Sequence, residues 1–199
     1  METVATVRGR PREFDVEAAL STALRVFWEK GYDGASLSDL TEAMGITRPS
    51  LYAAFGNKED LFKRALDLYE SEKLAYFRSA LEAPTARGVA QRLFEGTIHN
   101  ITSECPGCLG VITAVSCRSP DSPIREDIQA RTHTLREAMV ARMQRAIDEG
   151  DFTTPVEAEG MTHYLLAVLQ GISVQAGSGA CREELQKVAE AALAIWPGR

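Results

Sequence analysis

The sequence predicts an all-α protein of about nine helices, and three observations support this fold class. Apolar residues recur at three- and four-residue spacings along most of the chain, while strand-like alternation is nearly absent. Glycine, proline and capping residues separate these periodic stretches at short intervals. The composition is that of an ordinary globular protein, because 45% of the 199 residues are hydrophobic and 25% are charged.

Three short helices are expected near the N-terminus, each with its own start and stop signals. Ser36 precedes Asp39 by three residues, which is the spacing of a capping box. Pro49 follows Thr47 in the first turn of the third helix, where the missing N–H of proline costs nothing. Asp15 is a suitable N-cap, and glycines close the helices. The expected segments are 15–31, 36–45 and 47–56.

Six further helices are expected beyond residue 57, and most of them are longer. Pro84, the turn at 105–108, the segment 119–123 and Gly150 interrupt the helical periodicity. A glycine-containing hinge, 177–179, separates the last two helices. The expected segments are 58–81, 85–102, 109–117, 123–149, 155–176 and 182–196.

Charge and hydropathy restrict the class of protein. The formal net charge of −6 argues against a diffuse nucleic-acid binder, although it permits a small basic footprint on an acidic body. No stretch of about 18 apolar residues is present, and no apolar segment follows the charged N-terminus, so neither a membrane span nor a secretory signal is expected. We therefore expect a cytoplasmic protein whose cysteines are reduced thiols.

The second and third expected helices, joined by a turn at Gly45, form a helix-turn-helix pattern. Leu40 and Leu51 provide an inward apolar contact on each side of the turn. Any three-helix bundle can imitate this pattern, so it does not establish DNA binding by itself. Polar and aromatic residues on the third helix can reach phosphates and base edges: Thr47, Arg48, Ser50 and Tyr52.

A longer run makes the indication specific. Residues 37–62, LSDLTEAMGITRPSLYAAFGNKEDLF, resemble the DNA-binding domain of TetR/AcrR-type transcriptional regulators. The most specific part is 51–61, which is similar to the tyrosine-to-phenylalanine end of that family's recognition helix and the lysine that opens its fourth helix. The spacing of Phe27, Gly31 and Tyr32 also fits. The strong resemblance covers about residues 12–65, and beyond it only the number and order of helices are similar.

The resemblance implies a function and a domain organisation. It implies a transcriptional regulator, a repressor that binds a palindromic operator as a homodimer and is released by a small, largely apolar effector. Double-stranded DNA, that effector and a second copy are thus the expected partners, with no membrane partner, cofactor, metal site or catalytic residue. The implied parts are a basic N-terminal arm, 1–11, a DNA-binding domain, 12–65, with its helix-turn-helix at about 36–55, and a ligand-binding and dimerisation domain, 66–199.

Matching positions identify the residues that would contact DNA. Three of them have alternatives: Tyr52 could be a core aromatic, and Ser36 and Thr47 could act purely as helix caps. The resemblance places Lys58 on a phosphate, and a lysine at a helix N-terminus is unfavourable beside the helix dipole without an anion. The full set from the resemblance is Ser36, Thr47, Arg48, Pro49, Ser50, Tyr52 and Lys58.

The N-terminal arm adds two more DNA-binding candidates. Arg8 and Arg10 lie in the segment RGRPR, 8–12, which is similar to the core of an AT-hook. Such arms can enter an A·T-rich minor groove, where the potential is most negative. A solvated tail is the open alternative.

The effector half offers candidates that depend on the resemblance and on apolar periodicity. Gln170 is notable because an amide on an otherwise apolar face needs a partner. A plain core position is the alternative for every ligand candidate, which are Leu66, Phe94, Ile98, Val111, Val115, Met139 and Gln170. The last two helices are apolar over broad surfaces, which favours burial against a second subunit. The interface candidates are Tyr164, Val168, Ile172, Leu185, Val188 and Ala192.

The cysteines suggest a competing function, an all-α enzyme or redox protein. Cys105, Cys108 and Cys117 could bind zinc or act as a redox switch, although the scattered histidines suggest no fourth ligand. The Pro-Gly between the first two thiols is equally typical of a turn. No hydrolase, zinc-protease, P-loop or complete dinucleotide motif occurs, so the sequence favours a regulator that is not an enzyme.

Overall fold

The computed structural model describes residues 14–103, 107–116 and 123–198. Within these ranges it contains ten α-helices, and its only β-type pairing is an isolated bridge between Phe152 and Gly198. The all-α class is therefore confirmed. The helices are α1 (Val16–Gly34), α2 (Leu37–Met44), α3 (Arg48–Phe55), α4 (Lys58–Lys73), α5 (Ala75–Leu81), α6 (Ala86–Ile101), α7 (Leu109–Ser116), α8 (Pro123–Asp148), α9 (Ala158–Gly177) and α10 (Arg182–Ala194).

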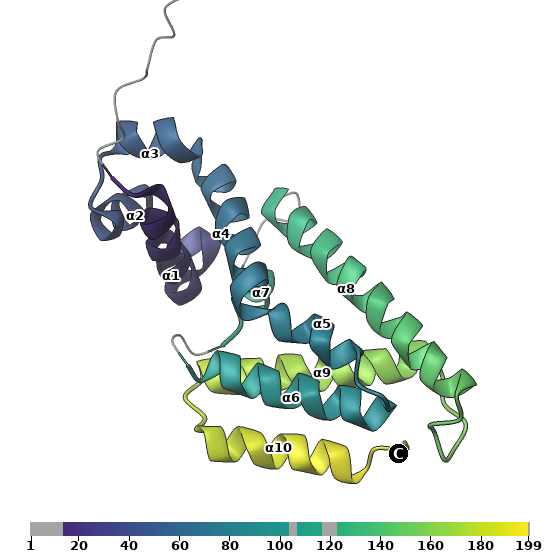
Figure 1. Cartoon of the computed structure of the whole chain (residues 1–199). Helices are drawn as coiled ribbons and strands as arrows, with labels where there is room; N and C mark the ends of the chain where they lie inside the picture. Colours follow the sequence, from purple (N-terminus) through teal and green to yellow (C-terminus); the bar gives the residue numbers. More distant parts are fainter. Residues whose placement is uncertain (1–13, 104–106, 117–122, 199) are drawn as a thin grey trace, which may run out of the picture.

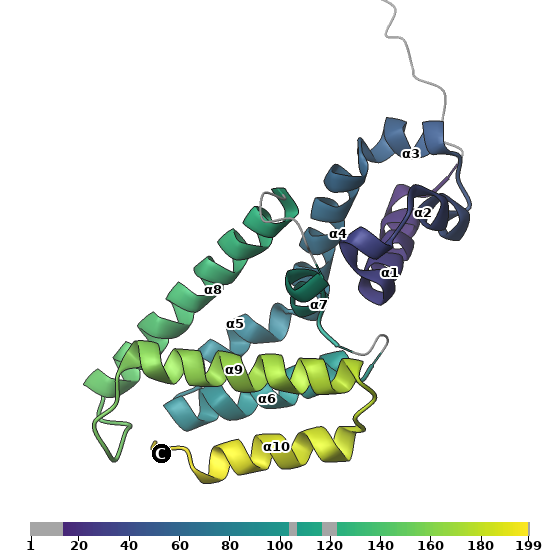
Figure 2. The same ribbon diagram turned by 180° about the vertical axis from the view of Figure 1, so that it is seen from behind.

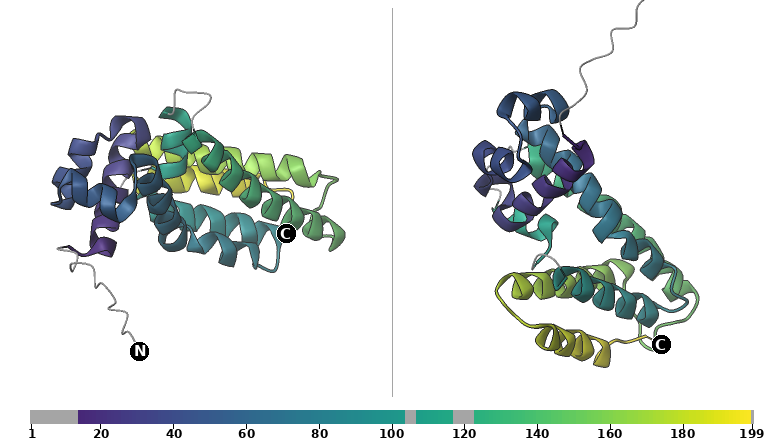
Figure 3. Two further views of the ribbon diagram at one scale, coloured as in Figure 1. Left: turned by 90° about the horizontal axis from the view of Figure 1, so that it is seen from above. Right: turned by 60° about the vertical axis from the view of Figure 1, so that its left-hand side comes forward.

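The helices form two groups that α4 connects. Helices α1, α2 and α3 make a small unit at one end of the molecule, and α4 leads away from α3 toward the other group (Figure 1). There α6, α9 and α10 pack side by side, with α5 against α6 and the long α8 against α9 (Figure 2). Seen from above, the α1–α3 unit lies beyond one end of these helices (Figure 3). No helix in the described ranges is long and apolar enough to span a membrane.

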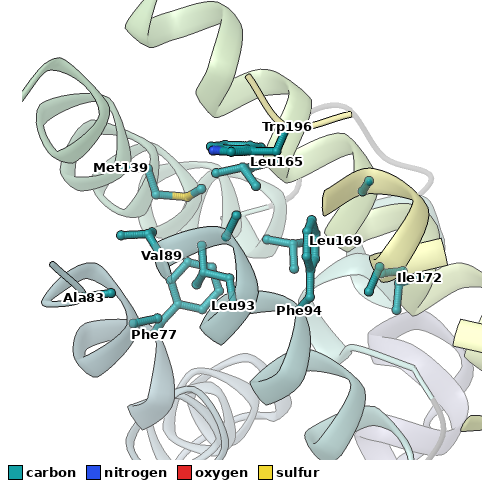
Figure 4. Packing of buried hydrophobic residues seen from close by; sticks show 14 of the residues in the cluster. Phe77, Ala83, Val89, Leu93, Phe94, Met139, Leu165, Leu169, Ile172 and Trp196 are labelled. Atoms are coloured by element: carbon teal, nitrogen blue, oxygen red, sulfur yellow. The ribbon is translucent and has the colours of Figure 1, made fainter. Parts of the chain in front are cut away.

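Two apolar clusters make up the core. The first joins α1, α2, α3 and α4, and it also takes in Leu109 of α7 and two residues of α8, Ile124 and Ile128. The second joins α5, α6, α8, α9 and α10. Figure 4 shows part of the second core, where side chains from several helices, among them Phe94 and Met139, fill one interior.

The two cores meet at the loop before α7. The indole Nε1 of Trp28 in α1 donates a buried hydrogen bond to the carbonyl oxygen of Gly107, at 2.9 Å. The Trp28 ring also packs edge-on against Tyr69 of α4, with 4.9 Å between ring centroids. Gly107 has φ +89°, and a Cβ there would lie 3.4 Å from the carbonyl oxygen of Ser173 in α9. This loop is thus packed between α1 and the C-terminal part of α9.

The helices predicted over 58–81 and 15–31 differ from those in the structure. The helix expected over 58–81 divides at Leu74 into α4 and α5. No glycine or proline marks this break, and it turns α5 so that it packs along α6. The first helix was expected to stop at Gly31, which does leave helical geometry with φ 69° and ψ 173°, but helix continues to Gly34.

Candidate DNA interface

The turn between α2 and α3 has the geometry that a helix-turn-helix requires. Gly45 adopts φ +63°, a left-handed conformation that favours glycine. The N–H of Ile46 donates to the carbonyl oxygen of Thr41 at 3.1 Å and closes the end of α2. Leu40 and Leu51, on either side of the turn, are fully buried in the first core, as predicted.

The start of α2 is held by a charged capping box. The Oγ of Ser36 accepts from the N–H of Asp39 at 3.0 Å, and the Asp39 carboxylate accepts from the N–H of Ser36 at 2.8 Å. The other Asp39 oxygen is paired with the ammonium of Lys30 in α1. The Lys30 ammonium, followed by the hydrogen bonds from Ser36, holds the pKa of Asp39 well below its usual range. This pair fixes α2 against α1.

Helix α3 begins with a similar but neutral cap. The N–H of Ser50 donates to the Oγ1 of Thr47 at 3.3 Å, and the two hydroxyl oxygens lie 2.9 Å apart. Arg48 extends toward α2, where its Nη2 donates to the Oγ of Ser38 at 2.8 Å. Both side chains of this last bond are on the surface. Ser36 and Thr47 are caps, and both remain exposed enough to contact a phosphate as well.

The outer face of α3 is open to solvent. Tyr52 is 49% exposed, which excludes the alternative that it is a core aromatic. Thr47, Arg48 and Pro49 are exposed, and Ser50 is half-buried. The DNA-binding candidates of α3 therefore lie together on one accessible end of the molecule, the end farthest from α10 in Figure 1.

Lys58 is not the unpartnered charge that the sequence suggested. Its Nζ lies 4.4 Å from the ring centroid of Tyr32, which itself packs against Phe27 and Phe62. The side chain is half-buried, and this burial lowers the pKa of Lys58, with Asp33 the largest opposing influence. The cation–π contact places the ammonium at the start of α4, beside the α1–α3 unit.

Several contacts at this end were not predicted. The Lys30–Asp39 pair and the Arg48–Ser38 hydrogen bond each join two different helices, so no local spacing in the sequence marks them. Arg64 of α4 likewise donates to the carbonyl oxygen of Ala54 at 3.0 Å. The arm candidates Arg8 and Arg10 lie outside the described residues.

The predicted ligand residues do not form one group. Leu66 belongs to the first core, whereas Phe94, Ile98 and Met139 belong to the second. Val111 is half-buried in α7, and the side chain of Val115 lies outside what the structure describes. Two surface hollows of about 280 and 470 Å³ lie in the described part of the chain, and neither is lined by any of these candidates.

The predicted environment of Gln170 was wrong. Its side chain is exposed on α9, because the buried face of that helix runs through Leu165, Leu169, Ile172 and Ala176. The amide therefore faces solvent in the protomer and needs no buried partner.

The predicted interface residues divide into two kinds. Ile172, Leu185 and Ala192 are buried within the protomer, so they are core positions and cannot form the outer surface. Tyr164, Val168 and Val188 are half-buried and can still contact a neighbour. The structure adds two exposed apolar residues that the prediction missed, Val174 at 51% and Ile195 at 73% exposure.

Of the three clustered cysteines, only Cys108 is described. It is half-buried, and its Sγ accepts a hydrogen bond from the hydroxyl of Tyr69 at 3.3 Å. Cys105 and Cys117 lie outside the described residues. Among the described residues no group of three or more metal-ligating side chains gathers in one place.

Comparison with known proteins assigns this end of the molecule. Residues 19–65 match the model of the family described as bacterial regulatory proteins, tetR family. The chain is 33% identical to the HTH-type transcriptional repressor ComR of Escherichia coli K12, across 98% of this chain and 95% of ComR. It is 31% identical to the repressor BdcR of the same organism, across 90% of this chain and 87% of BdcR.

A solved structure extends the similarity to the whole fold. The TetR family transcriptional regulator CifR, a cysteine mutant complexed with 26-bp double-strand operator DNA, superposes with a TM-score of 0.87. The two chains are 42% identical, and the match covers 95% of this chain and 100% of the other.

Proposed function

Because this chain belongs to the tetR family of bacterial regulatory proteins and is a DNA-binding transcriptional regulator, we propose that it is a repressor that binds operator DNA as a dimer. The observation that carries the proposal is the outer face of α3. It presents Arg48 and Tyr52 to solvent, at the end of the molecule where capped helix N-termini are also exposed. Exposed donors in this arrangement suit the major groove.

Each DNA candidate has a distinct role in the proposal. Arg48 reads a base edge, which requires it to leave the Ser38 hydroxyl that holds it in the free protein. Ser36 and Lys58 bind phosphates at the starts of α2 and α4, and these contacts set position without reading sequence. Thr47, Pro49, Ser50 and Tyr52 form the surface of α3 against the groove. Arg8 and Arg10 enter the adjoining minor groove.

The proposed dimer uses the outer faces of α9 and α10. Val174 is exposed on α9, and Ile195 is exposed at the C-terminal end of α10. Tyr164 and Val168 of α9 and Val188 of α10 are half-buried. Large apolar side chains exposed on adjacent helices favour contact with a second copy. A two-fold dimer would place its two α3 helices about 34–36 Å apart, or a simple multiple, to match half-sites one DNA turn apart.

Release from DNA by a small effector completes the proposed function. In this proposal residues 1–11 are a DNA-binding arm, 12–65 the DNA-binding domain, and 66–199 the part that binds effector and dimerises. Helix α4 connects the two groups of helices, and Trp28 ties α1 to the loop before α7. These connections support coupling between effector binding and the spacing of the α3 helices.

Selection of bound sequences from a random DNA pool tests the repressor proposal. We expect a palindromic consensus, with two half-sites spaced by about 10 base pairs or a multiple. Affinity should fall with salt, with a log–log slope of about −0.9 for each phosphate neutralised. A folded dimer that enriches no sequence would contradict the proposal, and a consensus without two-fold symmetry would contradict the dimer.

A further inference from the structure

Uncharged polar side chains meet at one edge of the second core, where α4, α5, α6 and the loop before α7 come together. The amide Nδ2 of Asn100 donates to the hydroxyl of Tyr69 at 3.3 Å, and that hydroxyl donates to the Sγ of Cys108. The hydroxyl oxygens of Tyr76 and Thr97 lie 2.8 Å apart and share a second hydrogen bond. We call these five residues the polar cluster.

Asn100 uses little of its hydrogen-bonding capacity. Its side chain is buried, with 6% exposure, and a side-chain amide offers two N–H donors and one carbonyl acceptor. Among the residues that the structure describes, the amide has one hydrogen-bonding partner, at a distance beyond the usual range for N–H···O bonds. The second N–H and the carbonyl oxygen of this amide are therefore available to a further hydrogen-bonding group.

The ring of Tyr76 packs on α6 about one helical turn before Asn100. It lies directly on the backbone of α6 at Gly96, since a Cβ there would fall 2.2 Å from a ring carbon. Tyr76 belongs to α5, just after the break at Leu74, and α5 has no side-chain cap at its first residue. A helix start without a side-chain cap is held less firmly than a helix interior, so the Tyr76 ring can leave without disturbing α6.

We propose that Tyr76 occupies the polar end of the effector site, and that the effector is an uncharged, largely apolar molecule carrying one hydrogen-bonding group. The effector displaces the Tyr76 ring from Gly96, takes over the bond to Thr97 and meets the Asn100 amide. This proposal rests on the proposed function, because it assigns a ligand class to the site through which the protein leaves DNA.

The absence of charge in the polar cluster selects an uncharged ligand. Burial raises the pKa of both Tyr69 and Tyr76, so their hydroxyls stay neutral near pH 7. The carboxylates of α4 closest to Tyr69 in sequence, Asp67 and Glu70, are already paired with Arg131 of α8. A charged ligand would lose its hydration here without gaining a counter-ion.

The location of the polar cluster explains how its occupation would reach the DNA-binding end. Tyr69 hydrogen-bonds to Cys108 and packs against Trp28, and Trp28 donates to Gly107. A ligand that draws Asn100 or Tyr69 away from its present partner therefore acts on the contact between α1 and the loop before α7.

Full-length Tyr76→Ala with p-cresol as probe tests the proposal. The probe is the side-chain fragment that the substitution removes, and toluene, p-toluate and 4-methylbenzylammonium share its ring. By calorimetry we expect p-cresol to bind Tyr76→Ala at least about tenfold more tightly than it binds wild type. Toluene and the two ions should each bind the variant at least about tenfold more weakly than p-cresol does. Toluene lacks the one or two hydrogen bonds of p-cresol, and the ions lose their hydration on entry. The same p-cresol concentrations should weaken operator binding.

Phe77→Ala is the matched control. Phe77 is a buried ring on the same helix, 5.5 Å from the Tyr76 ring between centroids, and it lies among apolar side chains of the second core. Its removal leaves an apolar hole, so toluene should bind that variant at least as well as p-cresol. Preference for p-cresol there as well would mean that the polar cluster does not supply the selectivity.

Tyr76→Phe keeps the test decisive if the alanine variant fails to fold. It retains the ring but loses the bond to Thr97, so the ring leaves more easily and p-cresol should bind several-fold more tightly than to wild type. Unchanged affinity would overturn the proposal, as would tight binding of either ion, or p-cresol binding that leaves operator affinity unchanged. Failure of wild type to bind any operator would instead contradict the repressor function, and the calorimetry would still test the site.

Discussion

Arg48 is held in the free protein by Ser38, and this bond must break if the guanidinium reads a base. The hydrogen bond is 2.8 Å long and joins α3 to α2 on the surface. Ser38→Ala removes it without touching the arginine. We therefore expect the substitution to tighten operator binding, because the free protein no longer loses a contact when it docks.

The size of the effect follows from the setting of the bond. Net contributions of hydrogen bonds are about 0.5–1.5 kcal/mol, and those to charged groups are larger. Both side chains here are exposed, so water competes, and a value of about 1 kcal/mol, or roughly fivefold in affinity, is appropriate. Arg48→Ala should cost about 1–3 kcal/mol on the operator and relax the preference at one base pair.

A double-mutant cycle on fluorescently labelled operator provides the assay. In the Arg48→Ala background, Ser38→Ala should change nothing, since the partner is gone. Ser79→Ala on α5, another exposed serine, is the control and should leave affinity unchanged. Weaker binding by Ser38→Ala, or an equal effect in both backgrounds, would refute the idea that Arg48 leaves Ser38 to read DNA.

Four other predictions concern phosphate binding, packing, pH and thiols. Lys58→Met should weaken binding to all sequences similarly and reduce the salt slope by about 0.9, and a loss confined to the operator would contradict the phosphate role. Trp28→Phe leaves the buried carbonyl oxygen of Gly107 without its donor, so it should lower the free energy of unfolding, measured in urea, by about 1–3 kcal/mol. An unchanged free energy of unfolding would refute the contribution of that hydrogen bond. The pKa of Asp39 is lower in the folded than in the unfolded state, so its stabilising contribution is present above about pH 4 and is lost as the pH falls below that value. Asp39→Asn should therefore flatten the fall in the free energy of unfolding between about pH 5 and pH 2. An unchanged fall in the variant would contradict the role of Asp39. Joint replacement of Cys105 and Cys108 by serine should keep operator affinity within a few-fold, and reversible release by mild oxidation of wild type alone would overturn this.

Local signals made most of the DNA-binding end predictable. The capping box at Ser36, the cap at Thr47 and the turn at Gly45 depend on residues within four positions of each other, and all three have the expected geometry. Leu40 and Leu51 were predicted as the inward contacts on each side of that turn, and both are buried. The Arg48 contact with α2 was not predicted, because it depends on how two helices lie side by side.

The part of the chain beyond residue 65 was less predictable because its arrangement depends on distant contacts. The break at Leu74 coincides with no breaker residue and is accompanied by the packing of Tyr76 on Gly96, about twenty residues away in the chain. Apolar periodicity identifies buried positions without saying which core they enter, so Leu66 was grouped with residues of the second core. The same limitation placed Gln170 on an inner face.

The division of the interior into two cores has an optical consequence. The chain has two tryptophans, and each core contains one of them, Trp28 in the first and Trp196 in the second. Replacing Trp196 by phenylalanine would leave Trp28 as the sole indole emitter, in contact with both the DNA-proximal helices and the loop before α7. Its emission spectrum would report operator and effector binding in real time, without any attached label.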